Sequence, residues 1–179
     1  MASSGLTRRM LYWGILTMLA LVILFLKILP LNLLPGRLPG PLWLLPFTYC
    51  WVLRRPEYVP VPLVAGLLLI YDFMFMQPPG LMAALGVIGL EFLRSRAPYS
   101  RDIPFLFEWA MIAGVLFAIA LVSHFILAIF VLTQPSIAME SMQLGTTVVF
   151  YPVIVGISTY ILGVRRATPG ELDQLGNTA

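Results

Sequence analysis

The stretch GLLLIYDFMFMQPPG, residues 66–80, is an apolar segment that contains one carboxylate and ends in a proline-glycine turn. Asp72 stands among leucine, isoleucine, phenylalanine and methionine, and no neighbour on its own helix can neutralise it. A charged group inside a membrane is costly, so such a residue is expected to have a structural or functional role. Pro78, Pro79 and Gly80 break the helical pattern, and they predict that the chain reverses direction directly after the segment.

The composition of the whole chain is that of a membrane protein. Hydrophobic residues make up 60% of the 179 residues and charged residues 11%, whereas a soluble domain has about 25% charged residues. Most of the surface is therefore expected to face lipid. The net charge is +3, but the arginines come in separated pairs, which argues against nucleic acid as a partner. The single cysteine, Cys50, excludes an internal disulfide and multi-cysteine metal sites.

Six apolar segments are predicted to form membrane-spanning helices. A helix needs about 20 residues to cross ~30 Å of hydrocarbon, and three of the segments have that length. The other three, in the middle of the chain, are shorter, so the alternatives for them are half-membrane hairpins or buried helices. The six predicted spans are residues 10–29, 39–53, 60–76, 80–93, 105–132 and 141–164.

The basic residues favour six spans, because short cytoplasmic loops retain arginine and lysine. With six spans and both termini cytoplasmic, nine of the eleven basic residues face the cytoplasm. Omitting a middle span would move an arginine cluster such as Arg54 and Arg55 to the other side. The expected fold is therefore an all-α integral membrane protein, with one membrane domain over residues 1–166. Residues 167–179 are expected to form a disordered, polar cytoplasmic tail.

The sequence contains no pattern typical of a catalytic or metal site. His124 is the only histidine, and the adjacent Ser123 would point in a different direction on a helix. Glycine-rich phosphate-binding loops are absent as well. We therefore expect no enzymatic activity, no metal and no cofactor, and we expect His124 to hydrogen-bond across helices. Ala110, Gly114 and Ala118 form a small-xxx-small row that would let another helix approach closely.

Two further polar pairs are predicted inside the membrane. Glu91 and Arg94 are three residues apart on one helical face, which favours a local ion pair. Lys27 and Asp72 lie at similar predicted depth in different spans, so an ion pair between them is one hypothesis for how the carboxylate is neutralised. The alternatives are a protonated aspartate that caps a helix end, or an aspartate that faces a polar cavity.

Several of these features occur together in one known family. Arg55-Pro56-Glu57-Tyr58-Val59 leads into an apolar helix, Asp72 lies near the end of that helix, and the Pro/Gly turn ends eight residues later at Gly80. The segment 91–96 closes the fourth predicted span, and Phe150-Tyr151-Pro152 lies in the last. With this pattern, over nearly its whole length, the chain resembles the MreD family of rod shape-determining proteins.

The resemblance implies a non-enzymatic membrane component of the bacterial cell-wall elongation machinery, located in the inner membrane. It implies binding to MreC and a place in one assembly with MreB, RodA and the partner transpeptidase of RodA. Structural or partner-recognition roles are expected for Lys27, Arg54, Arg55, Pro56, Glu57, Asp72, Pro78, Pro79, Gly80, Glu91, Arg94 and Pro152.

The same resemblance leaves a second function open. The fold of the family is similar to that of the substrate-binding subunits of energy-coupling-factor vitamin transporters, so small-molecule binding is the alternative. Polar residues such as Gln77, Glu140 and Gln143 are expected near the outer face. An outer pocket of ~300 Å³ or more with convergent polar groups would favour this alternative, whereas a closed and dry outer half would exclude it.

Overall fold

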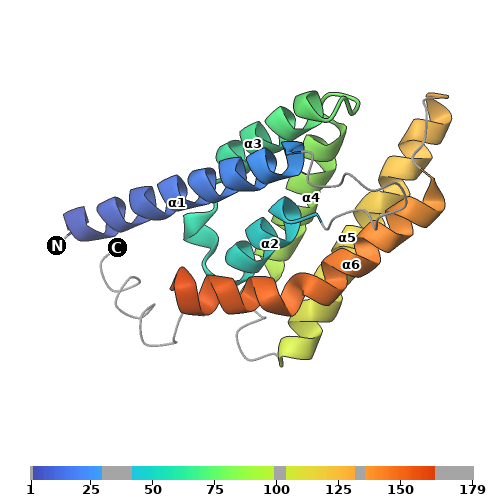
Figure 1. Ribbon diagram of the computed structural model, residues 1–179. Coiled ribbons are helices and arrows are strands. Elements are labelled where there is room, and N and C mark those ends of the chain that lie inside the picture. Colours follow the sequence, from blue (N-terminus) through green and yellow to red (C-terminus); the bar gives the residue numbers. More distant parts are fainter. Residues whose placement is uncertain (1, 30–41, 99–103, 132–135, 164–179) are drawn as a thin grey trace.

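The computed structural model describes residues 2–29, 42–98, 104–131 and 136–163, which form helices and turns without a strand (Figure 1). The all-α architecture predicted from the composition is confirmed for this part of the chain. The predicted tail, 167–179, lies outside the described residues. The helices are α1 (Ala2–Ile28), α2 (Leu44–Arg54), α3 (Val61–Met74), α4 (Leu81–Arg96), α5 (Phe105–Ile129) and α6 (Ile137–Gly156). A 3-10 turn, η1 (Pro56–Tyr58), precedes α3, and a π-helical turn, η2 (Ile157–Ile161), extends α6.

Three of the described helices are long and apolar enough to cross a membrane. They are Arg9–Ile28, Phe105–Ile129 and Ile137–Tyr160. The helices α2, α3 and α4 contain 11, 14 and 16 residues. At ~1.5 Å per residue even the longest of these reaches only about 24 Å, which is less than the hydrocarbon thickness.

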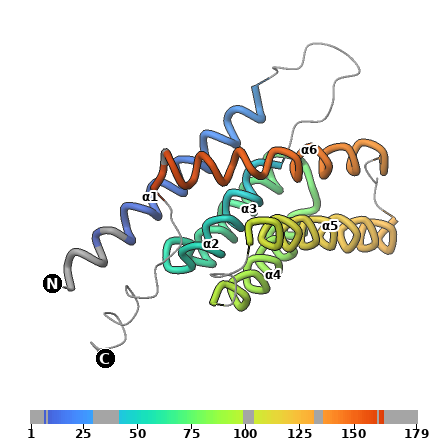
Figure 2. Tube along the Cα trace, turned by 90° about the horizontal axis from the view of Figure 1, so that it is seen from below, coloured from blue at the N-terminus to red at the C-terminus, as the bar shows by residue number. Residues whose placement is uncertain are grey.

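The shortest helix, α2, forms the centre of the molecule. All of its eleven residues are buried, and Figure 2 shows it enclosed by the longer helices. Its sequence, LLPFTYCWVLR, is largely apolar on every side until the final arginine, and a helix of that kind lies in a protein core or in a membrane. The second predicted span is therefore surrounded by protein in this structure, and Cys50 is buried within it.

Glycines let α4 pack closely against its neighbours. A Cβ atom added to Gly89 would lie 2.5 Å from the Tyr49 hydroxyl and 2.9 Å from Val115, which is too close for real atoms. One added to Gly86 would lie 2.6 Å from Leu68. The Tyr49 hydroxyl also donates a hydrogen bond of 3.0 Å to the carbonyl of Gly86. The missing side chains therefore determine how near α2, α3 and α5 come to α4.

The helices α5 and α6 lie side by side along one side of the molecule (Figures 1 and 2). The small row on α5, Ala110, Gly114 and Ala118, is exposed, and a Cβ atom at Gly114 would meet nothing within 4 Å. The packing of the described residues therefore does not require a glycine at this position.

The bundle has two chemically different ends. One end, which we call the basic end, carries Arg9, Arg54, Arg55, Arg94 and Arg96. There α1 meets η1: the ring of Tyr12 stacks on that of Tyr58 at 4.1 Å, and the Trp13 indole donates to the carbonyl of Glu57 at 3.4 Å. The opposite end, called the far end, carries the α3–α4 turn, the last residues of α5 and the first residues of α6.

Candidate functional site

At the far end, Asp72 caps the helix that follows its own. Its Oδ2 atom accepts hydrogen bonds from the backbone N–H of Gly80 at 2.9 Å and of Ala83 at 3.3 Å. Gly80 is the N-cap residue of α4, so the carboxylate satisfies N–H groups that have no partner within the helix. The dipole of α4 also favours a negative charge at this position, next to the N-terminus of the helix. Asp72 is fully buried, and its Oδ1 atom has no hydrogen-bond partner among the described residues.

The turn between the two helices is built for this contact. The carbonyl of Asp72 accepts from the N–H of Gln77 at 3.0 Å, which closes α3 around Met76 with its positive φ of 51°. Pro78 and Pro79 then carry no N–H groups that would need partners. Gly80 has a φ of 88°, a conformation that favours glycine. The chain reversal predicted from these residues is confirmed.

The predicted ion pair between Lys27 and Asp72 is wrong. The ammonium group of Lys27 donates a hydrogen bond to the Tyr71 hydroxyl instead. It lies 4.4 Å from the ring centroid of Tyr71 and 4.5 Å from that of Phe75, where the ring faces attract a cation. Tyr71 and Asp72 are neighbours on a helix and point in different directions, so a residue near one is not near the other. Of the alternatives, the structure contains the helix cap, while protonation of Asp72 stays a prediction.

At the basic end, the residues of the Arg-Pro-Glu segment hold η1 against α1 and α4. Pro56 begins the turn, and Arg55 lies 3.5 Å from Glu57 across it. Arg94 forms the predicted ion pair with Glu91, at 3.1 Å, and donates a second hydrogen bond to the carbonyl of Val59. The Glu91–Arg94 prediction is therefore confirmed, and Arg94 also connects the end of α4 to the start of α3.

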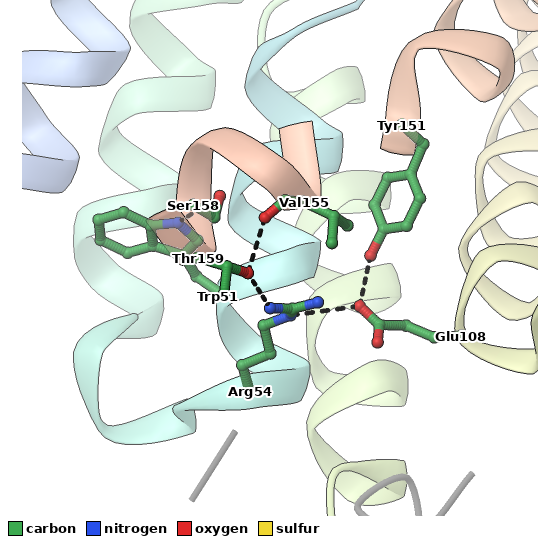
Figure 3. A network of polar contacts seen from close by, with 7 residues as sticks. All are labelled: Trp51, Arg54, Glu108, Tyr151, Val155, Ser158 and Thr159. Carbon is green, nitrogen blue, oxygen red and sulfur yellow. Dashed lines mark hydrogen bonds and ion pairs between the residues drawn. The ribbon is translucent and has the colours of Figure 1, made fainter. Parts of the chain in front are cut away.

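A buried polar network joins α2, α5 and α6 near the same end. Figure 3 shows the guanidinium of Arg54 between the carboxylate of Glu108 and the hydroxyl of Thr159. Arg54 Nε lies 3.5 Å from Glu108 Oε1, and the same oxygen accepts a hydrogen bond of 2.7 Å from the Tyr151 hydroxyl. Arg54 and Glu108 are 9% and 2% exposed, so both charges are almost completely removed from solvent.

A second contact of the network fixes the π-helical turn to α2. The indole N–H of Trp51 donates to the Ser158 hydroxyl at 3.1 Å, and both residues are fully buried (Figure 3). A π-helical turn widens the helix locally and is frequently found at functional sites. Here it presents Ser158 and Thr159 to two different residues of α2. Nothing in the sequence identified Glu108 or Tyr151 as members of the network.

Pro152 interrupts α6, and a residue of another helix compensates for the interruption. A proline has no N–H, so the carbonyl four residues earlier, that of Val148, loses its helical partner. The indole N–H of Trp109 donates to this carbonyl at 2.9 Å. Trp109 on α5 therefore supplies the hydrogen bond that Pro152 removes, which the sequence did not reveal because the two residues lie 43 positions apart.

His124 and Glu140 connect α5 and α6 at the far end. The Nδ1 atom of His124 lies 3.2 Å from Glu140 Oε2. This confirms the expected hydrogen bond of His124 across helices. Glu140 in turn belongs to the wall of a cavity of about 900 Å³, which is open at the far end.

The cavity lies between the α3–α4 turn and the helices α5 and α6. Polar side chains of Gln77, Ser123, Glu140 and Gln143 line it, together with a larger apolar surface. The volume exceeds the ~300 Å³ expected of a small-molecule site. Within the part of the chain that the structure describes, no three histidine, cysteine, aspartate or glutamate side chains are grouped as metal ligands. The cavity is therefore large enough to hold a small molecule, while these residues form no metal centre.

Comparison of the chain with known protein families, curated proteins and solved structures gave no match. The class that the described residues define is an all-helical protein with three helices long and apolar enough to span a membrane.

Proposed function

We propose that this chain is a non-enzymatic scaffold subunit of the bacterial cell-wall elongation machinery. In this function it binds MreC and helps to maintain rod cell shape, within an assembly that includes MreB, RodA and the partner transpeptidase of RodA. The proposal places the chain in the inner membrane with six spans and both termini in the cytoplasm.

The observation that carries the proposal is the helix cap made by Asp72. The aspartate and the Pro/Gly turn eight residues later are central to the resemblance to the MreD family, and the carboxylate contacts the N–H of Gly80. For the carboxylate of Asp72 to reach the N–H of Gly80, the number of residues between the two positions must be fixed. The matched motif therefore has a physical reason in this chain, which supports the resemblance as more than a similarity of hydrophobic pattern.

The distribution of charge supports the proposed orientation. Arg9, Arg54, Arg55, Arg94 and Arg96 share one end of the bundle, where helix ends from distant parts of the sequence meet. Arginine in short loops is retained on the cytoplasmic side, so the basic end is proposed to face MreB and the anionic inner leaflet.

Co-purification with MreC tests the function. The tagged chain and MreC are co-expressed, extracted in mild detergent and purified on the tag. We expect MreC in the eluate with the wild-type chain and with Asp72→Asn, provided that Asp72 acts only as a cap. A chain that elutes as a folded, monodisperse species without MreC would contradict the scaffold function.

Cysteine labelling tests the orientation, because the single natural cysteine, Cys50, is buried. Met76→Cys introduces a thiol at the far end, where Met76 is 95% exposed, and Arg96→Cys introduces one at the basic end. A membrane-impermeant maleimide should label the first variant in intact spheroplasts and the second only after lysis. The reverse pattern would invert the proposed topology.

The cavity favours a second candidate function, that of a small-molecule-binding subunit of a vitamin-type membrane transporter. Its volume and its four polar side chains meet the criterion stated for that alternative. Native mass spectrometry of the purified chain distinguishes the two functions. A bound, water-soluble molecule of vitamin size would support the transporter subunit, whereas stoichiometric MreC without such a molecule would support the scaffold.

A further inference from the structure

The cavity at the far end has a graded chemistry along its length. The glutamine and glutamate side chains of Gln77, Glu140 and Gln143 come from the α3–α4 turn and from the first turns of α6. The deepest α5 residue in its wall is Leu116, which lies 13 residues before the last residue of α5. At ~1.5 Å per residue this depth corresponds to about 20 Å. The cavity is therefore polar at its mouth and extends far into the apolar part of the bundle.

The apolar part is made mainly of aliphatic side chains from several helices. Leu45 of α2, Ile119 of α5 and Leu144 of α6 contribute to it. Such a surface gains free energy when hydrocarbon covers it and offers no hydrogen bonds to a polar ligand. Met76 and Met139 also line the cavity and are 95% and 65% exposed, so the rim is flexible and apolar as well.

The charge of the mouth restricts the head of a ligand. Among the described residues that line the cavity, Glu140 is the only aspartate, glutamate, lysine, arginine or histidine, and Tyr71 adds a phenol. Lys27 is not one of the lining residues, and its ammonium is held by the hydroxyl and ring of Tyr71, which lines the cavity. A negatively charged ligand head would lie beside the Glu140 carboxylate, whose Oε2 atom contacts His124 at 3.2 Å, whereas hydroxyl or amine groups can donate to Glu140, Gln77 and Gln143.

The walls on both sides are held in place independently of any ligand. The Asp72 cap fixes the α3–α4 turn, and the His124–Glu140 contact joins α5 to α6. A site that exists before binding loses little free energy to ordering when the ligand enters. The described helices thus form the cavity as part of the fold.

From this geometry we infer that the far-end cavity binds an amphiphile whose head carries hydroxyl or amine groups and no net negative charge. The head contacts Glu140 and the neighbouring glutamines, and the hydrocarbon chain lies along α5 toward Leu116. The inference rests on the cavity alone and does not depend on binding of MreC. Two sources have this chemistry, a membrane lipid and a free compound, and the experiment separates them.

The test uses photoactivatable dodecyl glucoside and dodecyl phosphate with the full chain in phosphatidylcholine nanodiscs. The two probes share one diazirine-bearing chain and differ only in the head. We expect saturable labelling of the α5 and α6 residues of the cavity by the glucoside. Labelling by the phosphate should reach at most about one tenth of that level. Glu140→Gln should reduce the difference between the two probes.

Filling the cavity provides the matched control. Ser123→Trp places a bulky ring in the cavity and should abolish saturable labelling, while Val122→Trp, at a position 43% exposed on the outer side of α5, should leave it unchanged. Ala120→Phe, also in the cavity wall, replaces the first variant if that chain does not fold.

Three results would overturn the inference. Labelling that never saturates and spreads evenly over the exposed face of α5 would mean that the probe reports only the surrounding lipid. Equal labelling by both probes would refute the role assigned to Glu140. Complete competition by free glucose, at the concentration at which unlabelled dodecyl glucoside competes, would show that the hydrocarbon chain adds nothing and that the ligand is a soluble compound.

Discussion

The indole N–H of Trp109 and the proline at position 152 should be energetically coupled, because one supplies the hydrogen bond that the other removes. Trp109→Phe deletes the donor to the Val148 carbonyl and retains most of the aromatic packing. Pro152→Ala restores a backbone N–H that can bond the same carbonyl within α6. The loss caused by Trp109→Phe should therefore depend on which residue occupies position 152.

The size of the effect follows from the unpaired carbonyl. An acceptor that is buried without a partner costs about 1–3 kcal/mol, and hydrogen bonds between helices in membrane proteins average ~0.6 kcal/mol with a maximum of ~1.7. Since Trp109 is only partly buried, we expect Trp109→Phe to lower the free energy of unfolding by roughly 1 kcal/mol, within these ranges. In the Pro152→Ala background the same change should cost about half as much or less, because α6 then provides the donor.

The measurement is a double-mutant cycle, with unfolding by SDS in mixed micelles followed by far-ultraviolet circular dichroism. Trp109→Tyr serves as the control, because it keeps an aromatic ring with a donor group, but this hydroxyl does not lie where the indole N–H does. Equal losses from Trp109→Phe in both backgrounds would refute the coupling. In that case the Val148 carbonyl has another partner, and Trp109 does not compensate for the hydrogen bond that Pro152 removes.

The same unfolding assay tests three further contacts. Asp72→Ala should cost about 1–2 kcal/mol through loss of the cap, and Asp72→Asn less than half of that, because the amide retains an accepting oxygen; equal losses would show that the charge decides the effect. Arg54→Met or Glu108→Leu alone should cost roughly 3–5 kcal/mol by removing the ion-pair partner of a buried charge, while the double variant should lose less than either single one. Gly89→Ala should cost about 1–3 kcal/mol by overpacking, whereas Gly145→Ala, at a position with open space around it, should gain up to ~1 kcal/mol. A smaller loss at Gly89 than at Gly145 would mean that α4 can move away from its neighbours.

Local sequence spacing was sufficient to predict a contact where the interacting residues belong to one helix, or where only one kind of residue could be the partner. Glu91 and Arg94 are three residues apart, and helix geometry alone brings them together. The position of the chain reversal also followed from local chemistry, since Pro78, Pro79 and Gly80 restrict the backbone whatever surrounds them.

Sequence spacing did not predict the contact where two possible partners on another helix lie at the same depth and only one of them contacts the residue. Lys27 was paired with Asp72 because both lie near the same end of their helices, yet the ammonium contacts Tyr71, one position away. Adjacent residues on a helix are separated by about 100° around its axis, so depth without rotation does not identify a partner. The rotation of a helix is set by its packing, which no single segment contains.

The sequence by itself determined the helical class of the secondary structure and predicted lipid as its surroundings, because 60% of the residues are hydrophobic and many of them lie in long uncharged segments. Only the tertiary structure decided that α2 is buried on all sides, that Asp72 caps α4, that Trp109 compensates for Pro152, and that Glu108 meets Arg54. Each of these contacts joins groups from different segments, and its energy depends on distances that exist only after the helices have packed together.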